Sequence, residues 1–154
     1  MKSTLTILLF CILTLTSVQA QESTLDRQAI IKYRRLFMEI KGKHNQAIKL
    51  LVMQEIPFHS HIVTHAEALS NMAEDMLRLF PKGSQGPQSR ALPSIWDKDG
   101  NLSSAFIAQV DVMKKEAKKM AEVAKAGDNE AIRQQLRQLA SNGCRGCHTL
   151  FRGE

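Results

Sequence analysis

The stretch "CRGCHTLFR", Cys144 to Arg152, brings two cysteines and a histidine into fixed register close to the end of the chain. Residues three and four positions apart on a helix share a face, so Cys144, Cys147 and His148 would project to the same side. Two thiols at this spacing can each form a thioether with a haem vinyl group, and the adjacent imidazole can reach the iron. The motif predicts one covalently bound haem c, attached through Cys144 and Cys147, with His148 as a ligand of the iron.

Three other arrangements use a Cys-x-x-Cys pair: a disulfide loop, a redox-active pair and half of a zinc site. A redox pair is expected beside alternating strands and helices, and no strand pattern follows residue 20. A zinc site needs further ligands, yet the other histidines lie more than seventy residues before Cys144. A helical protein with a disulfide between Cys144 and Cys147 is therefore the main alternative to a haem protein.

The first twenty residues, "MKSTLTILLFCILTLTSVQA", have the pattern of a secretory signal peptide. Lys2 precedes an apolar run, and the run ends in Val18-Gln19-Ala20, which predicts cleavage after Ala20. The run is too short and too poorly flanked for a stable membrane span. We therefore expect a signal peptide at residues 1–20 and a periplasmic domain at 21–154 that does not span the membrane.

The rest of the sequence reads as helix throughout, with apolar residues at helical spacing. The spacing predicts helices over residues 25–54, 58–80 and 102–125, and a fourth from 128 or 129 to 151. Ser23 or Thr24 is the expected N-cap of the first helix, and Gly127 the expected C-cap of the third. Residues 81–100 form a long loop with three of the four prolines. This order predicts an all-α, antiparallel four-helix bundle.

The composition argues against a nucleic-acid-binding protein. The formal charge is +6 and falls to +5 when Lys2 leaves with the signal peptide. The basic residues are scattered over helical faces, and the chain has one Trp and one Tyr for stacking on bases. A modest positive charge is compatible with docking to an acidic protein partner.

Three segments of the chain resemble the cytochrome c′ family and its low-spin relatives. They are "KYRRLFM" at residues 32–38, "IW" at 95–96 and "CRGCHTLFR" at 144–152. The resemblance covers essentially the whole mature chain. It implies a periplasmic four-helix bundle with one haem c bound by the last helix.

The resemblance also implies roles for residues away from the Cys-x-x-Cys-His motif. In this family the distal haem face is covered by the residue four positions after the Arg of a Tyr-Arg pair, which is Met38 here. A thioether can bind iron, so the resemblance implies a six-coordinate, low-spin haem with His148 and Met38 as axial ligands. A plain core methionine at position 38 is the alternative. Competing ligands are His44 and the cluster of His59, His61 and His65.

Four further residues are candidates for contact with the haem. The resemblance implies that Arg34 lies near a haem propionate and that Arg152 lies near His148. Phe37 and Trp96 could pack on the ring, and ordinary core packing is an equally good reading of both.

These features predict a monohaem cytochrome that carries single electrons between redox protein partners, as a monomer or a homodimer. No residue pattern demands acid–base or nucleophilic catalysis, so we expect no enzyme activity. The alternative is a five-coordinate, c′-like protein that binds NO or CO at the distal haem face.

Overall fold

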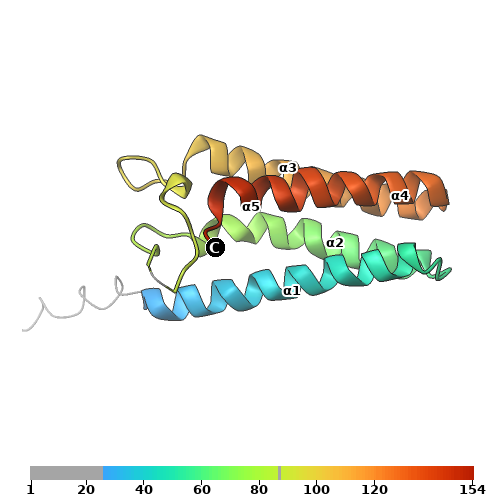
Figure 1. The fold of residues 1–154 in the computed structure, drawn as a ribbon, viewed down its shortest axis with the longest axis horizontal. Coiled ribbons are helices and arrows are strands. Elements are labelled where there is room, and N and C mark those ends of the chain that lie inside the picture. Colours follow the sequence, from blue (N-terminus) through green and yellow to red (C-terminus); the bar gives the residue numbers. More distant parts are fainter. Residues whose placement is uncertain (1–25, 87) are drawn as a thin grey trace, which may run out of the picture.

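The computed structural model describes residues 26–86 and 88–154, and within them the chain is helical (Figure 1). The helices are α1 (Arg27–Met53), α2 (His59–Met76), α3 (Ser104–Ala126) and α4 (Asn129–Gln138). Helix α4 continues through the π-helical turn η3 (Leu139–Arg145) into α5 (Gly146–Phe151). The signal peptide expected at 1–20 lies outside the described residues. No helix of the described part is long and apolar enough to cross a bilayer.

Short polar side chains cap α1, α3 and α4, and a glycine ends α3. Asp26 caps α1 by accepting a hydrogen bond from the Gln28 N–H, so this helix starts later than predicted, and the candidate caps Ser23 and Thr24 lie outside the described residues. Gly127 ends α3 at φ 76°, a left-handed conformation that favours glycine, and Asp128 caps α4. The predicted C-cap at Gly127 is confirmed.

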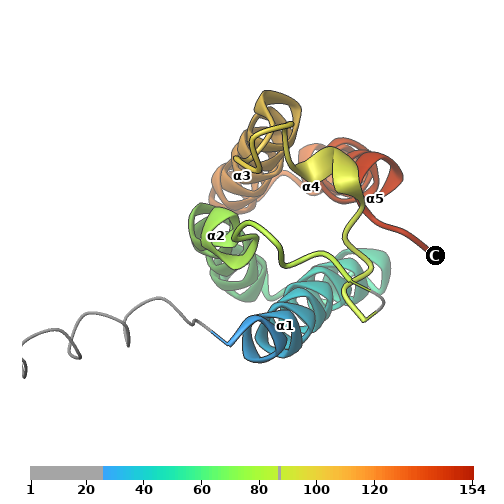
Figure 2. The same cartoon turned by 90° about the vertical axis from the view of Figure 1, so that its left-hand side faces the viewer.

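The end-on view shows the helices arranged around a common axis in the order α1, α2, α3 and α4–α5 (Figure 2). Neighbours run antiparallel, and α2 and α3 pack most extensively. Helix α1 contacts α4, but in the described chain it has little backbone contact with η3 or α5. The predicted antiparallel four-helix bundle is confirmed, with its loosest packing where α1 faces the Cys-x-x-Cys-His motif.

Two groups of buried side chains form the core. The first occupies the half of the bundle that holds the α1–α2 and α3–α4 turns, and includes Ile48, Ile62, Met120 and Leu139. The second lies at the other end, which we call the loop end because residues 77–86 and 88–103 cross it. This loop-end cluster consists of Phe37, Met76, Phe80, Ile95, Phe106, Val110 and Phe151, with Met38, Met72, Trp96 and Cys147 among the partly buried residues packed against it.

A buried arginine of α1 holds the crossing loop in place. The Arg34 guanidinium is 2% exposed and donates hydrogen bonds to the carbonyl oxygens of Leu79 and Ser84 and to the hydroxyl oxygens of Ser84 and Ser89. It also lies over the Phe80 ring, 4.5 Å from its centre, in cation–π contact. Arg34 therefore joins α1 to the loop at Leu79, Ser84 and Ser89.

We predict that Arg34→Met lowers the free energy of unfolding by about 2–4 kcal/mol, because it leaves buried carbonyl and hydroxyl groups without their donor. Denaturant unfolding of the purified protein measures the change. Arg35→Met is the matched control, since Arg35 is exposed on the same helix and its loss should change stability by no more than about 0.5 kcal/mol. Equal stability of the two variants would contradict an anchoring role for Arg34.

Candidate haem-binding site

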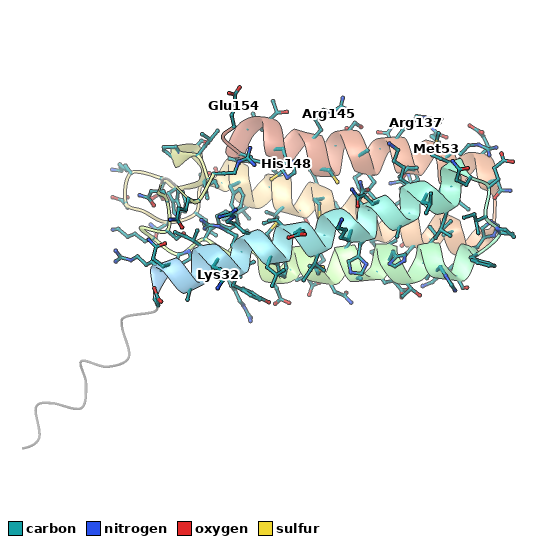
Figure 3. All side chains as sticks on the ribbon, turned by 60° about the horizontal axis from the view of Figure 1, so that its bottom comes forward. Lys32, Met53, Arg137, Arg145, His148 and Glu154 are labelled. Atoms are coloured by element: carbon teal, nitrogen blue, oxygen red, sulfur yellow. The ribbon has the colours of Figure 1, made fainter. Side chains whose placement is uncertain are left out.

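The Cys-x-x-Cys-His motif spans the junction of η3 and α5. Cys144 lies in η3, and Cys147 and His148 lie in the first turn of α5. Both thiols are free and partly buried, so no disulfide joins them in this structure. Figure 3 shows His148 at the loop end of the bundle, far from Met53 at the opposite end. The motif therefore presents two thiols and an imidazole beside the loop-end cluster.

Two glycines let this segment approach α3. A Cβ added at Gly143 would lie 3.4 Å from the Met113 Cα, and one added at Gly146 would lie 3.0 Å from the Gln109 Nε2. Both distances are at or below ordinary van der Waals contact, so larger residues would push η3 and α5 away from α3. Gly146, between the two cysteines, thus fits the packing against α3 as well as the requirement for a small residue beside a haem edge.

The electrostatic surroundings leave all three groups of the motif uncharged at neutral pH. Burial raises the pKa of the Cys144 and Cys147 thiols, although the nearby Lys41 ammonium partly opposes this. The pKa of His148 is lowered, mainly because neighbouring side chains remove part of its ring from water, and further by the positive charges of Arg152 and Lys41. A neutral imidazole keeps a nitrogen lone pair available for a metal.

Helix α1 places Phe37 and Met38 at the loop-end cluster. Phe37 is buried in it, and Met38 is partly buried against it, as is Cys147 from α5. Trp96 packs against Phe80 with ring centres 6.3 Å apart and donates its Nε1–H to the Phe80 carbonyl oxygen. The structure thus brings Met38 and the Cys147 thiol to one cluster, while ligation by Met38 and stacking of Phe37 or Trp96 on a haem stay predictions.

The two arginines have defined neighbours. The Nη1 of Arg152 lies 3.5 Å from the Nδ1 of His148, one turn away on the same helical segment. The Nη1 and Nη2 groups of Arg34 donate to the loop, as described above. The contact of Arg34 with a haem propionate stays a prediction, and the loop contacts are a role that the sequence did not reveal.

The histidines weighed as competing ligands lie elsewhere. His44 on α1 and His65 on α2 bond to each other, with their Nδ1 atoms 2.9 Å apart. His59 bonds to Asn129 at the end of the bundle opposite the loop. No group of three or more metal-binding side chains forms among residues 26–86 and 88–154.

Sequence reasoning missed one residue of this site, Lys41. Its Nζ contacts the sulfur of Met76 on α2 at 3.2 Å and that of Met113 on α3 at 3.6 Å. It also lies close enough to both cysteine thiols to influence their pKa values. The signal was available, because Lys41 follows Met38 by three positions and so shares its helix face.

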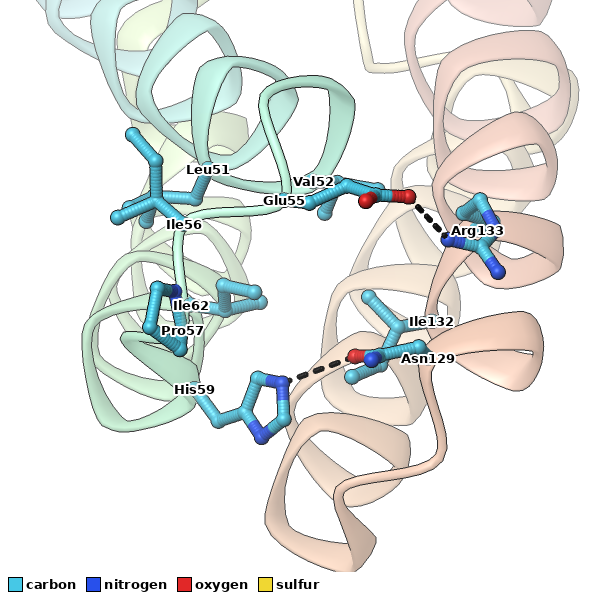
Figure 4. Close-up of a pocket in the computed structure, with 10 residues that line it drawn as sticks. All are labelled: Leu51, Val52, Glu55, Ile56, Pro57, His59, Ile62, Asn129, Ile132 and Arg133. Atoms are coloured by element: carbon cyan, nitrogen blue, oxygen red, sulfur yellow. Dashed lines mark hydrogen bonds and ion pairs between the residues drawn. The ribbon is translucent and has the colours of Figure 1, made fainter.

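The residues of the loop end fit a haem. The thiols are free, the imidazole is neutral, the surrounding cluster is apolar, and α1 does not pack closely against α5. A hollow of about 110 Å³ lies at the opposite end between the α1–α2 turn and α4 (Figure 4). Glu55 and Arg133 form an ion pair beside it. Its volume falls below the usual range for cofactor pockets and it contains no thiol, so it is not a haem site.

A Cys-x-x-Cys-His motif at the end of a four-helix bundle defines the class of c-type haem proteins built on this fold. The family model described as "Cytochrome C'" matches residues 29–152, and the chain belongs to the cytochrome c′ family. A cytochrome c′ of Pararhodospirillum photometricum is 29% identical over 126 residues, covering 81% of this chain and 97% of the relative. The proteins of this family carry one covalently bound haem c with iron, which establishes the cofactor predicted from the motif.

Solved structures of cytochrome c prime from Alcaligenes xylosoxidans share the fold. The nitric oxide complex of one mutant superposes with a TM-score of 0.71 at 21% identity, covering 83% of this chain and 96% of that one. A variant with bound carbon monoxide superposes with a TM-score of 0.72 at 21% identity, covering 84% and 98%. At this identity the likeness establishes the fold alone.

We predict that each single variant, Cys144→Ser and Cys147→Ser, keeps the haem through its remaining thioether, whereas the double variant loses all covalent haem. Haem staining after denaturing electrophoresis and the intact mass measure attachment. Ser141→Ala is the matched control, because Ser141 is exposed on η3 and takes no part in the motif. Covalent haem in the double variant would contradict attachment through these thiols.

Proposed function

We propose that this protein is a periplasmic monohaem cytochrome that carries single electrons, with His148 and Met38 as the axial ligands of the iron. The observation that carries the proposal is the position of Met38. Its thioether lies on the face of α1 that packs against the loop-end cluster, and Cys147 packs against the same cluster from α5. A haem attached to α5 would then have an iron-binding sulfur available from α1.

The haem supplies one-electron chemistry at its iron, and the protein sets the surroundings of that iron. Cys144 and Cys147 hold the cofactor against η3 and α5. His148 offers a neutral imidazole, and Arg152 beside it disfavours protonation of that ring. The phenylalanines of the loop-end cluster, Phe37, Phe80, Phe106 and Phe151, exclude water from the interior. None of these residues needs to gain or lose a proton, which suits electron transfer and not an enzyme reaction.

A thioether ligand has two consequences for such a carrier. A neutral sulfur favours ferrous iron more than a second imidazole does, so it raises the reduction potential. Met38 also comes from α1 while His148 comes from α5, so ligation would hold together two helices that have little backbone contact with each other. The proposed ligand pair would therefore stabilise the bundle as well as the reduced haem.

The second candidate is a protein that binds NO or CO at a vacant distal face. Structures of Alcaligenes xylosoxidans cytochrome c prime that share this fold have nitric oxide or carbon monoxide bound. That observation favours diatomic ligands for this chain if Met38 does not occupy the iron. The two candidates thus differ in one bond, between the iron and the sulfur of Met38.

We predict that the wild-type ferric protein is low-spin, with a weak far-red sulfur-to-iron charge-transfer band, and that Met38→Ala is high-spin and lacks the band. The alanine has no atom that can reach the iron, so the reduced variant should also bind CO rapidly. Absorption and electron paramagnetic resonance spectra measure both changes.

Met72→Leu is the matched control for this experiment. Met72 is a partly buried methionine of the same loop-end cluster, and its replacement should leave the spectrum unchanged. A high-spin wild-type protein that takes up CO at once would reject electron transfer through a Met38-ligated haem and favour the gas-binding candidate.

A further inference from the structure

Lys41 points its ammonium group into the interior between the helices. The side chain starts on α1, and its Nζ reaches the Met76 sulfur on α2 and the Met113 sulfur on α3. The thiols of Cys144 and Cys147 lie near enough to act on its charge. A lysine of α1 thus contacts α2 and α3 and lies near the two thiols of the motif.

The ammonium group has no anionic partner in the described part of the chain. Its hydrogen-bond acceptors are two thioether sulfurs, which are weak acceptors, and no carboxylate forms an ion pair with it. Removal from water is the main cause that lowers the pKa of Lys41 to about 8. A charge held in such surroundings is unfavourable unless an anion lies beside it.

The haem propionates are poorly placed to be the anionic partner of Lys41. The thioethers form at the vinyl side of the ring, so Cys144 and Cys147, which lie near Lys41, mark that side. The propionates leave the opposite side of a haem. Arg34, which the family resemblance associates with a propionate, precedes Lys41 by seven residues, which is about 10 Å along a helix. We therefore expect that an anion stabilised by Lys41 comes from solution.

We propose that Lys41 forms an anion subsite on the Met38 face of the haem, for small anions that bind ferric iron. The inference rests on one part of the proposed function, that α1 lies on the haem face opposite His148. It does not require that Met38 is bound to the iron. Lys41 follows Met38 by three positions, so both side chains project to one side of α1. The ammonium would stabilise an anion at the iron and would give no comparable advantage to a neutral ligand.

The experiment compares an anion with a neutral ligand in the Met38→Ala protein, where the distal face is open. Azide and imidazole are titrated into the ferric haem at about pH 7, below the pKa of about 8, so that Lys41 carries its charge, and the imidazole affinity is calculated for its neutral form. We expect Lys41→Gln to weaken azide binding about tenfold, since one charge-assisted contact is lost, and to change imidazole binding less than about twofold. Absorption spectra give both affinities.

Lys43→Gln is the matched control, because Lys43 is exposed on the same helix and the variant removes the same charge. Its azide affinity should equal that of the Met38→Ala parent. Three results would overturn the proposal: equal losses for azide and imidazole, no change in azide affinity, or an equal azide loss in Lys43→Gln. A low-spin form that appears in alkali without added ligand and vanishes in Lys41→Gln would also overturn it, because the amine itself would then bind the iron.

The test separates this inference from the proposed function. If the wild-type ferric protein proves high-spin, electron transfer through a Met38-ligated haem fails. The azide and imidazole comparison is then made on the protein with Met38 intact, and its outcome still decides the role of Lys41.

Discussion

The close packing of η3 and α5 on α3 is the constraint on which the rest of the site depends. Gly143 and Gly146 bring this segment close to Met113 and Gln109. The segment is thus held on α3, and its Cys147 packs against the loop-end cluster. The π-helical turn immediately before α5 belongs to the same arrangement, and such turns occur often at functional sites. A loose segment could not keep three groups in the register that one haem requires.

Fixing the motif on α3 has a consequence for α1. The described part of α1 packs on α2 and reaches α4, but it does not close against α5. The loop end is instead crossed by residues 77–86 and 88–103, and Arg34 joins this connection to α1 through buried hydrogen bonds. The stability of this end of the bundle therefore depends on one buried charged residue. Stability at this end comes from a loop contact, and the helix interface is left for the cofactor.

The fold was predictable because its signals are local. Helical spacing, the left-handed Gly127 and the cap at Asp128 each act within a few residues, and the structure confirms the predicted bundle. The cofactor was predictable because its motif occupies five consecutive positions. The loop contacts of Arg34 were not, since the serines that accept from it lie fifty and fifty-five residues away. Lys41 was missed for a different reason: its spacing from Met38 indicated the shared helix face, but a lysine on a helix usually faces water.

The residues that determine the fold of this protein differ from those proposed to determine which ligands its haem iron binds. The fold holds at about one-fifth identity to its solved neighbours, because it depends on apolar spacing and on the motif. The proposed distal chemistry involves two side chains of α1. Met38 offers a neutral sulfur, while Lys41 offers a positive charge whose hydrogen-bond acceptors are two sulfur atoms. Ligation by the neutral Met38 sulfur would favour a six-coordinate electron carrier. The positive charge of Lys41 would favour an anion at the iron when Met38 is not bound. Whether Met38 binds the iron therefore decides the electron-transfer role. It also decides whether an anion from solution can bind the iron beside Lys41.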